Sequence, residues 1–293
     1  MKKILNFGSM NLDYVYAVES FVRPGETLAV KSLDVNCGGK GLNQSVAVAR
    51  AGGEVYHAGA SGNGGEMHLD FLSKSGVDTT YVKKVACQNG HAIIQVDSSG
   101  GNCILLYSGS NGMISEGYID EVLANFGEGD YLIAQNEISC VPYLLKRAKE
   151  RGMTVVFNPS PVTSDIDTYP LDCVSLFLVN EIEGETLAAC SDEEKIPEII
   201  YEKYGASVVL TLGERGSIYY DGKNTYRADV YKTKAVDTTG AGDTFTGYFV
   251  ASLCLGLSPS DAMKRASVAA GISVSRSGAA VSIPSADEVD KIL

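Results

Sequence analysis

The stretch AVDTTGAGDTFTGYF, from Ala235 to Phe249, places a run of small residues between two carboxylates and in front of an apolar tail. Gly240, Ala241 and Gly242 let the backbone approach a ligand closely, and the apolar residues after them recur at helical spacing. We therefore expect the small residues at a helix N-terminus. Backbone N–H groups and the helix dipole favour a phosphate or a developing anion there.

Asp243 falls in the first turn of this expected helix, where a carboxylate is also an ordinary helix-starting residue. Beside an anion site, the same carboxylate can accept a proton from an attacking hydroxyl while the amides stabilise charge on a transferred phosphoryl group. Asp237, on the other side of the small residues, either holds a cation or closes the turn.

A second glycine-rich stretch, NCGGKGLNQSVAVARAGG, also leads into a helical pattern. It does not match the P-loop pattern, because Gly41 follows Lys40 where Ser or Thr is required, and no segment matches the dinucleotide fingerprint GxGxxG. These mismatches argue against a P-loop NTPase and a Rossmann dehydrogenase. Lys40 and Asn43 can instead hydrogen-bond the hydroxyls of a sugar, although a flexible turn followed by an ordinary helix has the same pattern.

The segment NEIE follows a strongly apolar run and supplies Asn180 and Glu183 as oxygen ligands or water-holders suited to magnesium. The alternative is that Glu181, Glu183 and Glu185 begin a solvated helix.

Five apolar runs end on polar or glycine-bearing residues, and helical patterns lie between such runs. This alternation predicts an α/β fold with a mostly parallel sheet, and ligands collect at the carboxyl ends of the strands in such sheets. The runs are ILNFGS, YLIAQNE, TVVFNPSP, VSLFLVNEIE and SVVLTLGERG.

Helices are expected at NQSVAVARAGG, VPYLLKRAKERG, TFTGYFVASLCLGL and SPSDAMKRASVAAGISV, with Gly52, Gly152 and Gly256 as C-terminal caps. The regions 13–36 and 90–109 instead read as strands without intervening helices. They are predicted to pair into a small β element, with SSGGN as a hairpin turn.

The composition excludes several classes of protein. The net charge of -12 provides no basic field for nucleic acid or anionic lipid, and no apolar run is long enough to span a bilayer. Seven cysteines without a CxxC pair argue against a disulfide framework or a zinc site, so we expect a cytoplasmic protein. His57, His68 and His91 lack metal-ligand spacing.

Taken together, these motifs resemble the ribokinase-like, or PfkB-type, sugar kinases over nearly the whole chain. GGKGLNQSVAVARAGG and DTTGAGDTFTGYF resemble the two family signatures, and GSMNLD, PGET, NPSP, NEIE and TLGERG occur in the family's order. GSMNLD, GGKGLNQ and VSRSGAAVSIP are most similar to the ribokinase branch. The resemblance implies one kinase domain over residues 1–293, with a doubly wound, mostly parallel sheet flanked by helices and a small β-sheet lid.

The resemblance also implies the roles of the site residues. Asp243 would be the catalytic base, and Gly240, Ala241 and Gly242 would form the anion hole for the γ-phosphoryl group of ATP. Glu183 would organise the water shell of Mg²⁺. The sugar would contact Asn11, Asp13, Gly39, Lys40, Asn43 and Glu137, and the nucleotide would contact Asn180, Thr211, Gly213, Gly216, Gly242 and Ser267.

A monovalent cation, usually K⁺ in ribokinases, is implied behind the anion hole. The lid, formed by about residues 11–36 and 90–108, would close over the sugar and pair with a second copy in a homodimer. The cation's ligands would come from Asp237, Thr239, Ser273, Arg276, Gly278 and Ser282.

The expected activity is ATP-dependent phosphorylation of the primary hydroxyl of a pentose, with D-ribose giving ribose 5-phosphate. His91 replaces the small or β-branched residue usual in the lid strand and is expected near the sugar. This difference leaves open a nucleoside, pseudouridine or ketohexose kinase. A catalytically silent sugar-binding regulator is the alternative from another class, and the intact GAGD run argues against it.

Overall fold

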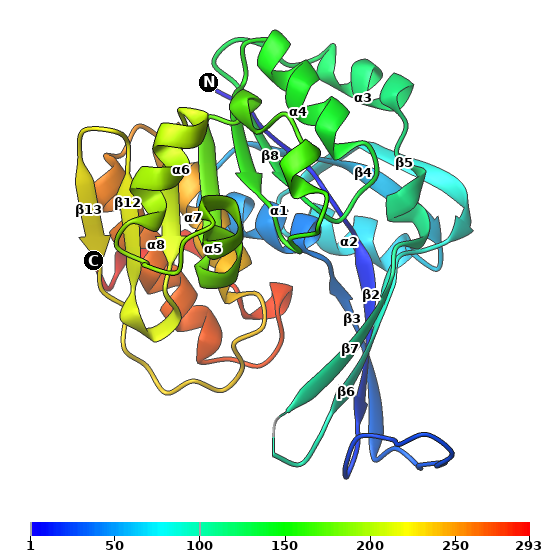
Figure 1. Ribbon diagram of the computed structural model, residues 1–293. Helices are drawn as coiled ribbons and strands as arrows, with labels where there is room; N and C mark the ends of the chain where they lie inside the picture. Colours follow the sequence, from blue (N-terminus) through cyan, green and yellow to red (C-terminus); the bar gives the residue numbers. More distant parts are fainter. Residues whose placement is uncertain (1, 100) are drawn as a thin grey trace.

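The computed structural model describes residues 2–99 and 101–293. Nine strands form one sheet in the order β13-β12-β11-β10-β9-β8-β1-β4-β5 (Figure 1). All neighbours are parallel except the β11–β12 and β12–β13 pairs. The strands are β1 (Ile4–Phe7), β4 (Val55–Asn63), β5 (Asp78–Gln88), β8 (Tyr131–Gln135), β9 (Thr154–Asn158), β10 (Leu176–Asn180), β11 (Ser207–Thr211), β12 (Ser217–Tyr220) and β13 (Thr225–Ala228).

The five apolar runs of the sequence are the five neighbouring strands β1, β8, β9, β10 and β11. Because these strands are parallel, their polar ends meet at one edge of the sheet. The predicted α/β fold with a mostly parallel sheet is confirmed.

Helices cover both faces of this sheet. One apolar core includes residues of α3 (Glu116–Leu123), α4 (Val141–Glu150), α5 (Glu181–Ala188) and α6 (Ile196–Tyr204). The core on the other face includes residues of α1 (Lys40–Arg50), α2 (Glu66–Lys74), α7 (Ala241–Cys254), α8 (Pro259–Val274) and α9 (Ala286–Asp290). Short 3-10 helices occur at η1 (Gly109–Met113), η2 (Ile166–Thr168), η3 (Leu171–Cys173), η4 (Gly213–Arg215) and η5 (Ala280–Ser282).

Helices α1 and α7 pack closely because Gly247 has no side chain. A Cβ atom at Gly247 would lie 2.3 Å from the Cβ of Ala47 and 2.8 Å from the carbonyl oxygen of Gln44. Gly247 follows Asp243 by about one helical turn, so this approach brings the N-terminal turns of the two helices together.

A second sheet projects from the main body and contains β2 (Asn11–Ala17), β3 (Ser32–Gly38), β6 (His91–Val96) and β7 (Asn102–Tyr107), in the order β3-β2-β6-β7 (Figure 1). It is the predicted small β-sheet lid, and its strands lie within residues 11–38 and 91–107, so β3 ends two residues beyond the expected segment of about 11–36. The predicted SSGGN turn includes Gly100, which, like Met1, lies outside the described residues.

The four predicted helices are present as α1, α4, α7 and α8, and Gly52, Gly152 and Gly256 all have positive φ just after helix ends. Within residues 2–99 and 101–293, no helix is long and apolar enough to cross a membrane.

Candidate active site

Asp243 lies in the first turn of α7 and is 8% exposed. Its two carboxylate oxygens accept hydrogen bonds from neighbouring residues of α1. Asn43 Nδ2 donates to Oδ2 at 2.9 Å, and Gln44 Nε2 donates to Oδ1 at 2.9 Å. The two glycine-rich segments of the sequence therefore meet at this carboxylate.

The small residues before Asp243 form the predicted helix start. Gly240 is the N-cap residue in a left-handed conformation, with φ 75°, and the helix begins at Ala241. A Cβ atom at Gly242 would contact nothing within 4 Å, so the helix start borders open space. The free N–H groups of a first helical turn make this region suited to an anion.

A cavity of about 220 Å³ lies in front of this helix start. It brings residues of the α1 and α7 helix starts to the carboxyl ends of β9, β10 and β11. Its lining includes Lys40, Asn158, Ser160, Asn180, Glu183, Thr211, Thr238, Gly240, Ala241, Gly242 and Asp243.

Burial lowers the pKa of Lys40, but the negative charges of Asp243, Glu137 and Glu183 outweigh it and raise the pKa above its usual value. Lys40 is therefore a cation that faces three carboxylates. Its backbone N–H also donates to Glu137 Oε2 at 3.1 Å.

Glu137 and Asp13 are further carboxylates of this region. Glu137 Oε2 also accepts the Ser9 hydroxyl at 2.5 Å, while burial raises its pKa. Burial, with Glu137 and Asp243, raises the pKa of Asp13 to about 7.

Asn11 and Gly39 complete the expected sugar side. The Oδ1 atom of Asn11 accepts Asn111 Nδ2 at 2.7 Å, and Gly39 is the N-cap of α1, with φ 92°. The lid face that carries Asp13 borders a cleft of about 600 Å³, whose opposite wall includes Asp237, Thr239 and Gly278.

A second cavity, of about 140 Å³, adjoins the first, because Thr211, Ala241 and Gly242 line both. Val230, Phe245 and Ala270 give it apolar walls, as a nucleotide base requires. Ser267 also lines it, but its hydroxyl donates to the carbonyl of Asp229 at 2.6 Å. The expected nucleotide residues Thr211, Gly213, Gly216, Gly242 and Ser267 all line this cavity.

Asn180 and Glu183 form a capping box at the start of α5. Glu183 N donates to Asn180 Oδ1 at 2.9 Å, and Asn180 N donates to Glu183 Oε2 at 3.1 Å. Glu183 is 4% exposed, and burial raises its pKa. The segment NEIE therefore begins a helix, but Glu183 is buried and not solvated as that alternative expected. Both Asn180 and Glu183 line the cavity, and their role at magnesium stays a prediction.

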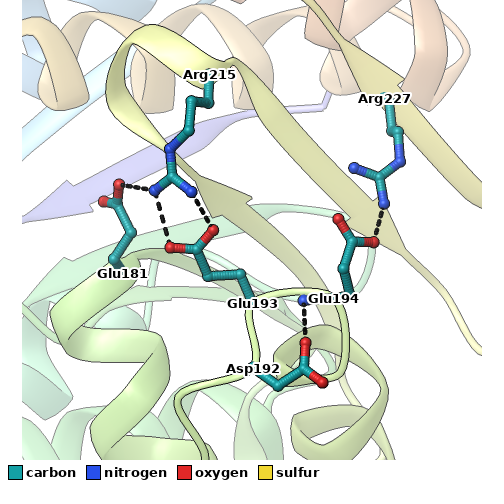
Figure 2. A network of polar contacts seen from close by, with 6 residues as sticks. All are labelled: Glu181, Asp192, Glu193, Glu194, Arg215 and Arg227. Atoms are coloured by element: carbon teal, nitrogen blue, oxygen red, sulfur yellow. Dashed lines mark hydrogen bonds and ion pairs between the residues drawn. The ribbon is translucent and has the colours of Figure 1, made fainter.

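Arg215, on the turn between β11 and β12, forms ion pairs with two glutamates (Figure 2). Its guanidinium donates to Glu181 Oε1 at 3.1 Å and to Glu193 Oε1 at 2.8 Å. These contacts connect the Gly213–Gly216 turn to the start of α5.

Five of the six expected cation ligands form two hydrogen-bonded groups, one around Asp237 and one around Ser273. The side chain of the sixth, Arg276, points into an ion pair. Asp237 accepts Thr239 N and Gly278 N, each at 2.9 Å. Burial raises the pKa of Asp237, but these hydrogen bonds lower it below its usual value overall. The hydroxyls of Ser273 and Ser282 lie 2.9 Å apart. The Arg276 side chain pairs instead with Glu288.

His91 does not join the site, and the expectation that it lies near the sugar is corrected by the strand register. It pairs with Leu12, whereas Asp13 pairs with Ala92, so His91 lies on the opposite lid face from Asp13. Its ring packs against Tyr14 and Tyr107, with centroid distances of 5.9 and 5.0 Å.

Sequence reasoning missed Ser9, Gln44, Asn111 and Asn158. One signal was available for Gln44. Lys40, Asn43 and Gln44 are spaced i, i+3, i+4, which places three polar side chains on one face of an otherwise apolar helix.

Comparison with known proteins agrees with this geometry. The model of the pfkB family carbohydrate kinases matches residues 1–286. A ribokinase of Haemophilus influenzae is 35% identical over 305 residues, covering 100% of this chain and 99% of the relative. A deoxyribokinase of Salmonella typhi is 29% identical, covering 98% and 97%. A solved ribokinase of Arabidopsis thaliana, complexed with ribose and ATP, is 28% identical with a TM-score of 0.87, covering 99% and 98%.

The chain therefore belongs to the pfkB family of carbohydrate kinases. It is a phosphotransferase that acts on a sugar hydroxyl.

Proposed function

We propose that this carbohydrate kinase transfers the γ-phosphoryl group of ATP to the primary hydroxyl of D-ribose, giving ribose 5-phosphate. The observation that carries the proposal is the position of Asp243. It lies at the start of α7, and its two carboxylate oxygens accept hydrogen bonds from Asn43 and Gln44 of α1. It also lines the first cavity, which adjoins the second cavity with its apolar walls. The likeness to ribokinases, one of them complexed with ribose and ATP, supports ribose as the acceptor.

In this proposal Asp243 accepts the proton of the attacking hydroxyl. The backbone N–H groups of the Gly240–Gly242 segment stabilise charge on the transferred phosphoryl group, and Lys40 adds a positive charge on the same side. Asn11, Asp13, Gly39, Asn43 and Glu137 orient the sugar, and Thr211, Gly213, Gly216 and Ser267 contact the nucleotide.

Mg²⁺ supplies charge neutralisation at the ATP phosphates. Glu183 and Asn180 fit a role at its water shell, because the buried Glu183 carboxylate lines the phosphate-side cavity. Among the described residues no group of three or more acidic, His or Cys side chains is placed to hold a metal ion. An ion bound largely through water and phosphate is compatible with that arrangement.

K⁺ would order the loop that carries the anion hole. Asp237, with its pKa held low, provides a carboxylate near the loop's start, and Thr239, Ser273, Arg276, Gly278 and Ser282 provide carbonyl or hydroxyl oxygens.

We also propose a homodimer formed through the lid. Leu33, Val35 and Leu105 are 48%, 42% and 65% exposed, and the register places them on the lid face that carries His91. Monomers rarely expose a continuous apolar face of this kind. Light scattering should give twice the chain mass, and Leu105→Glu should give one chain mass. A monomeric wild-type protein would contradict this part of the proposal.

ADP release should be measured with ribose, 2-deoxyribose, fructose, adenosine and pseudouridine, and the phosphorylated carbon identified by NMR. We expect the highest kcat/KM with ribose and a phosphate on its primary carbon. A higher kcat/KM with deoxyribose, fructose or a nucleoside would show that this compound is the acceptor, and the proposed kinase activity would stand. Tight sugar binding without turnover for every acceptor would favour a regulator.

A further inference from the structure

Gln44 contacts the proposed base from a fully buried position in α1, with 0% of its surface exposed. Its Nε2 atom donates to Asp243 Oδ1 at 2.9 Å and to Asn158 Oδ1 at 3.3 Å. Its Oε1 atom accepts a hydrogen bond from Gln135 Nε2 at 2.7 Å. A side chain without exposure can affect the substrate only through its neighbours.

The orientation of the Gln44 amide is set by residues on two strands of the sheet. Gln135, at the end of β8, donates its second N–H to Asn6 Oδ1 at 2.9 Å. Asn6, in β1, donates its own two N–H groups to the Gly41 carbonyl at 2.8 Å and to Ser45 Oγ at 2.9 Å. Both amides thus use all their donors in one arrangement. A reversed Gln44 amide would place its oxygen against the Asp243 carboxylate and its NH₂ against the Gln135 NH₂.

The chain of hydrogen bonds continues from Gln44 towards the nucleotide side. Asn158, at the end of β9, accepts from Gln44 and donates through Nδ2 to Glu183 Oε2 at 3.3 Å. The side chains of Gln44 and Asn158 therefore join Asp243, near the sugar, to Glu183, near the phosphates. Both carboxylates receive N–H donors from this chain.

We propose that Gln44 is a positioning residue for Asp243, an inference that rests on the function proposed above. Gln44 keeps Oδ1 occupied and Asn43 keeps Oδ2 occupied, so the carboxylate is fixed in rotation and its remaining lone pairs face the attacking hydroxyl. A donor that the sheet holds in place costs no reorganisation when the proton moves, which is the condition for an efficient base. The sugar itself is bound by other residues.

Gln44→Met tests this role because it keeps the size of the side chain and removes the donor. We expect kcat to fall about 10- to 100-fold, while KM for the sugar changes less than about threefold. Val46→Ala is the matched control. Val46 lies two residues further along α1, is equally buried, and packs in the apolar core on that face of the sheet, outside this chain of hydrogen bonds. This control should lower the melting temperature and leave kcat within about twofold.

Two outcomes overturn the proposal. One is a kcat for Gln44→Met within about twofold of wild type. The other is a loss of kcat in Val46→Ala as large as that in Gln44→Met, because general loosening of α1 would then account for both. Introduced into Asp243→Asn, Gln44→Met should reduce the residual rate little further, since its effect passes through Asp243. A full additional loss there contradicts the proposal.

Gln44→Glu tests the need for a donor at this position. The substitution is isosteric and places a second carboxyl against Asp243, so one proton is shared and the pKa of the pair rises. The acid limb of the kcat–pH profile should move upward by about one pH unit or more. An unmoved profile contradicts the proposal.

If the Gln44 variants do not fold, Gln135→Met tests the same role indirectly, because Gln135 contacts Gln44. It removes the donor that orients the Gln44 amide and should lower kcat about 3- to 10-fold, whereas unchanged kcat in the folded variant overturns the proposal. An inactive wild-type protein would refute the proposed function instead, so the two failures are distinguishable.

Discussion

Asn43 and Asp243 are 200 residues apart in the sequence, yet the amide of Asn43 donates to the carboxylate of Asp243 at 2.9 Å. The contact joins the starts of α1 and α7, two helices that both begin after glycine-rich segments. It is possible because Gly247 lets the two helices approach closely.

Gly247→Ala should disrupt this contact. The new Cβ would lie 2.3 Å from Ala47 Cβ, so α7 must move away from α1. Overpacking of this kind costs about 1–3 kcal/mol of stability. We expect a lower melting temperature and a kcat reduced more than about tenfold.

Gly117→Ala is the control for that variant, because a Cβ atom at Gly117 in α3 meets nothing within 4 Å. Replacing a helical glycine there should be neutral or stabilise the protein by up to about 1 kcal/mol. Normal activity in Gly247→Ala would show that the close approach of α1 and α7 is not required.

Asp13 predicts a pH dependence of stability. Its pKa is raised to about 7 in the folded protein, above the ordinary aspartate value of 3.8. Between these values the folded state binds more protons than the unfolded state, so this group makes stability fall as pH rises from about 4 to about 7. Asp13→Asn should remove this contribution. The melting temperature of the variant relative to wild type should therefore increase between pH 5 and pH 8, and a constant difference would contradict the raised pKa.

Arg215 is expected to support nucleotide binding through the turn that it stabilises. Surface ion pairs contribute little to global stability, so Arg215→Gln should leave the melting temperature nearly unchanged. It should raise KM for ATP about two- to fivefold at low salt, because the Gly213–Gly216 turn is less well ordered. Arg227→Gln is the control, since Arg227 pairs with Glu194 from β13 (Figure 2). Equal effects of the two variants would argue against a specific role for Arg215.

The proposed monovalent cation predicts faster turnover in KCl than in NaCl at equal ionic strength. Asp237→Asn should reduce this difference, because it removes the one carboxylate of the proposed ligand set. The ratio of kcat in the two salts is the measurement. A ratio near one for the wild-type protein would remove the cation from the proposal.

The sequence predicted the parts of this site that depend on local pattern. Strand ends at Asn158 and Asn180 follow from apolar runs that stop abruptly, and the helix start at Ala241 follows from small residues before an apolar period. That the five runs belong to one mostly parallel sheet followed from their alternation with helices, whereas their position as neighbours came from the structure.

Features set by long-range packing were not predictable in the same way. His91 was misplaced because one residue of register decides the face of a strand, and only the pairing of β6 with β2 fixes it. Gln44 gained its role from Gln135 and Asp243, which are distant in sequence. Strands β4, β5, β12 and β13 were not predicted, and β4 contains glycines that interrupt its apolar pattern.

The most direct test of the central claim is the rate of ADP formation from ATP and ribose by wild-type protein and Asp243→Asn, together with ribose binding by calorimetry. We predict ribose-dependent ADP formation by the wild type. In the variant we predict a kcat at least about a hundredfold lower with ribose binding still measurable, because the base acts mainly in the transition state. Unchanged turnover in Asp243→Asn would contradict the account.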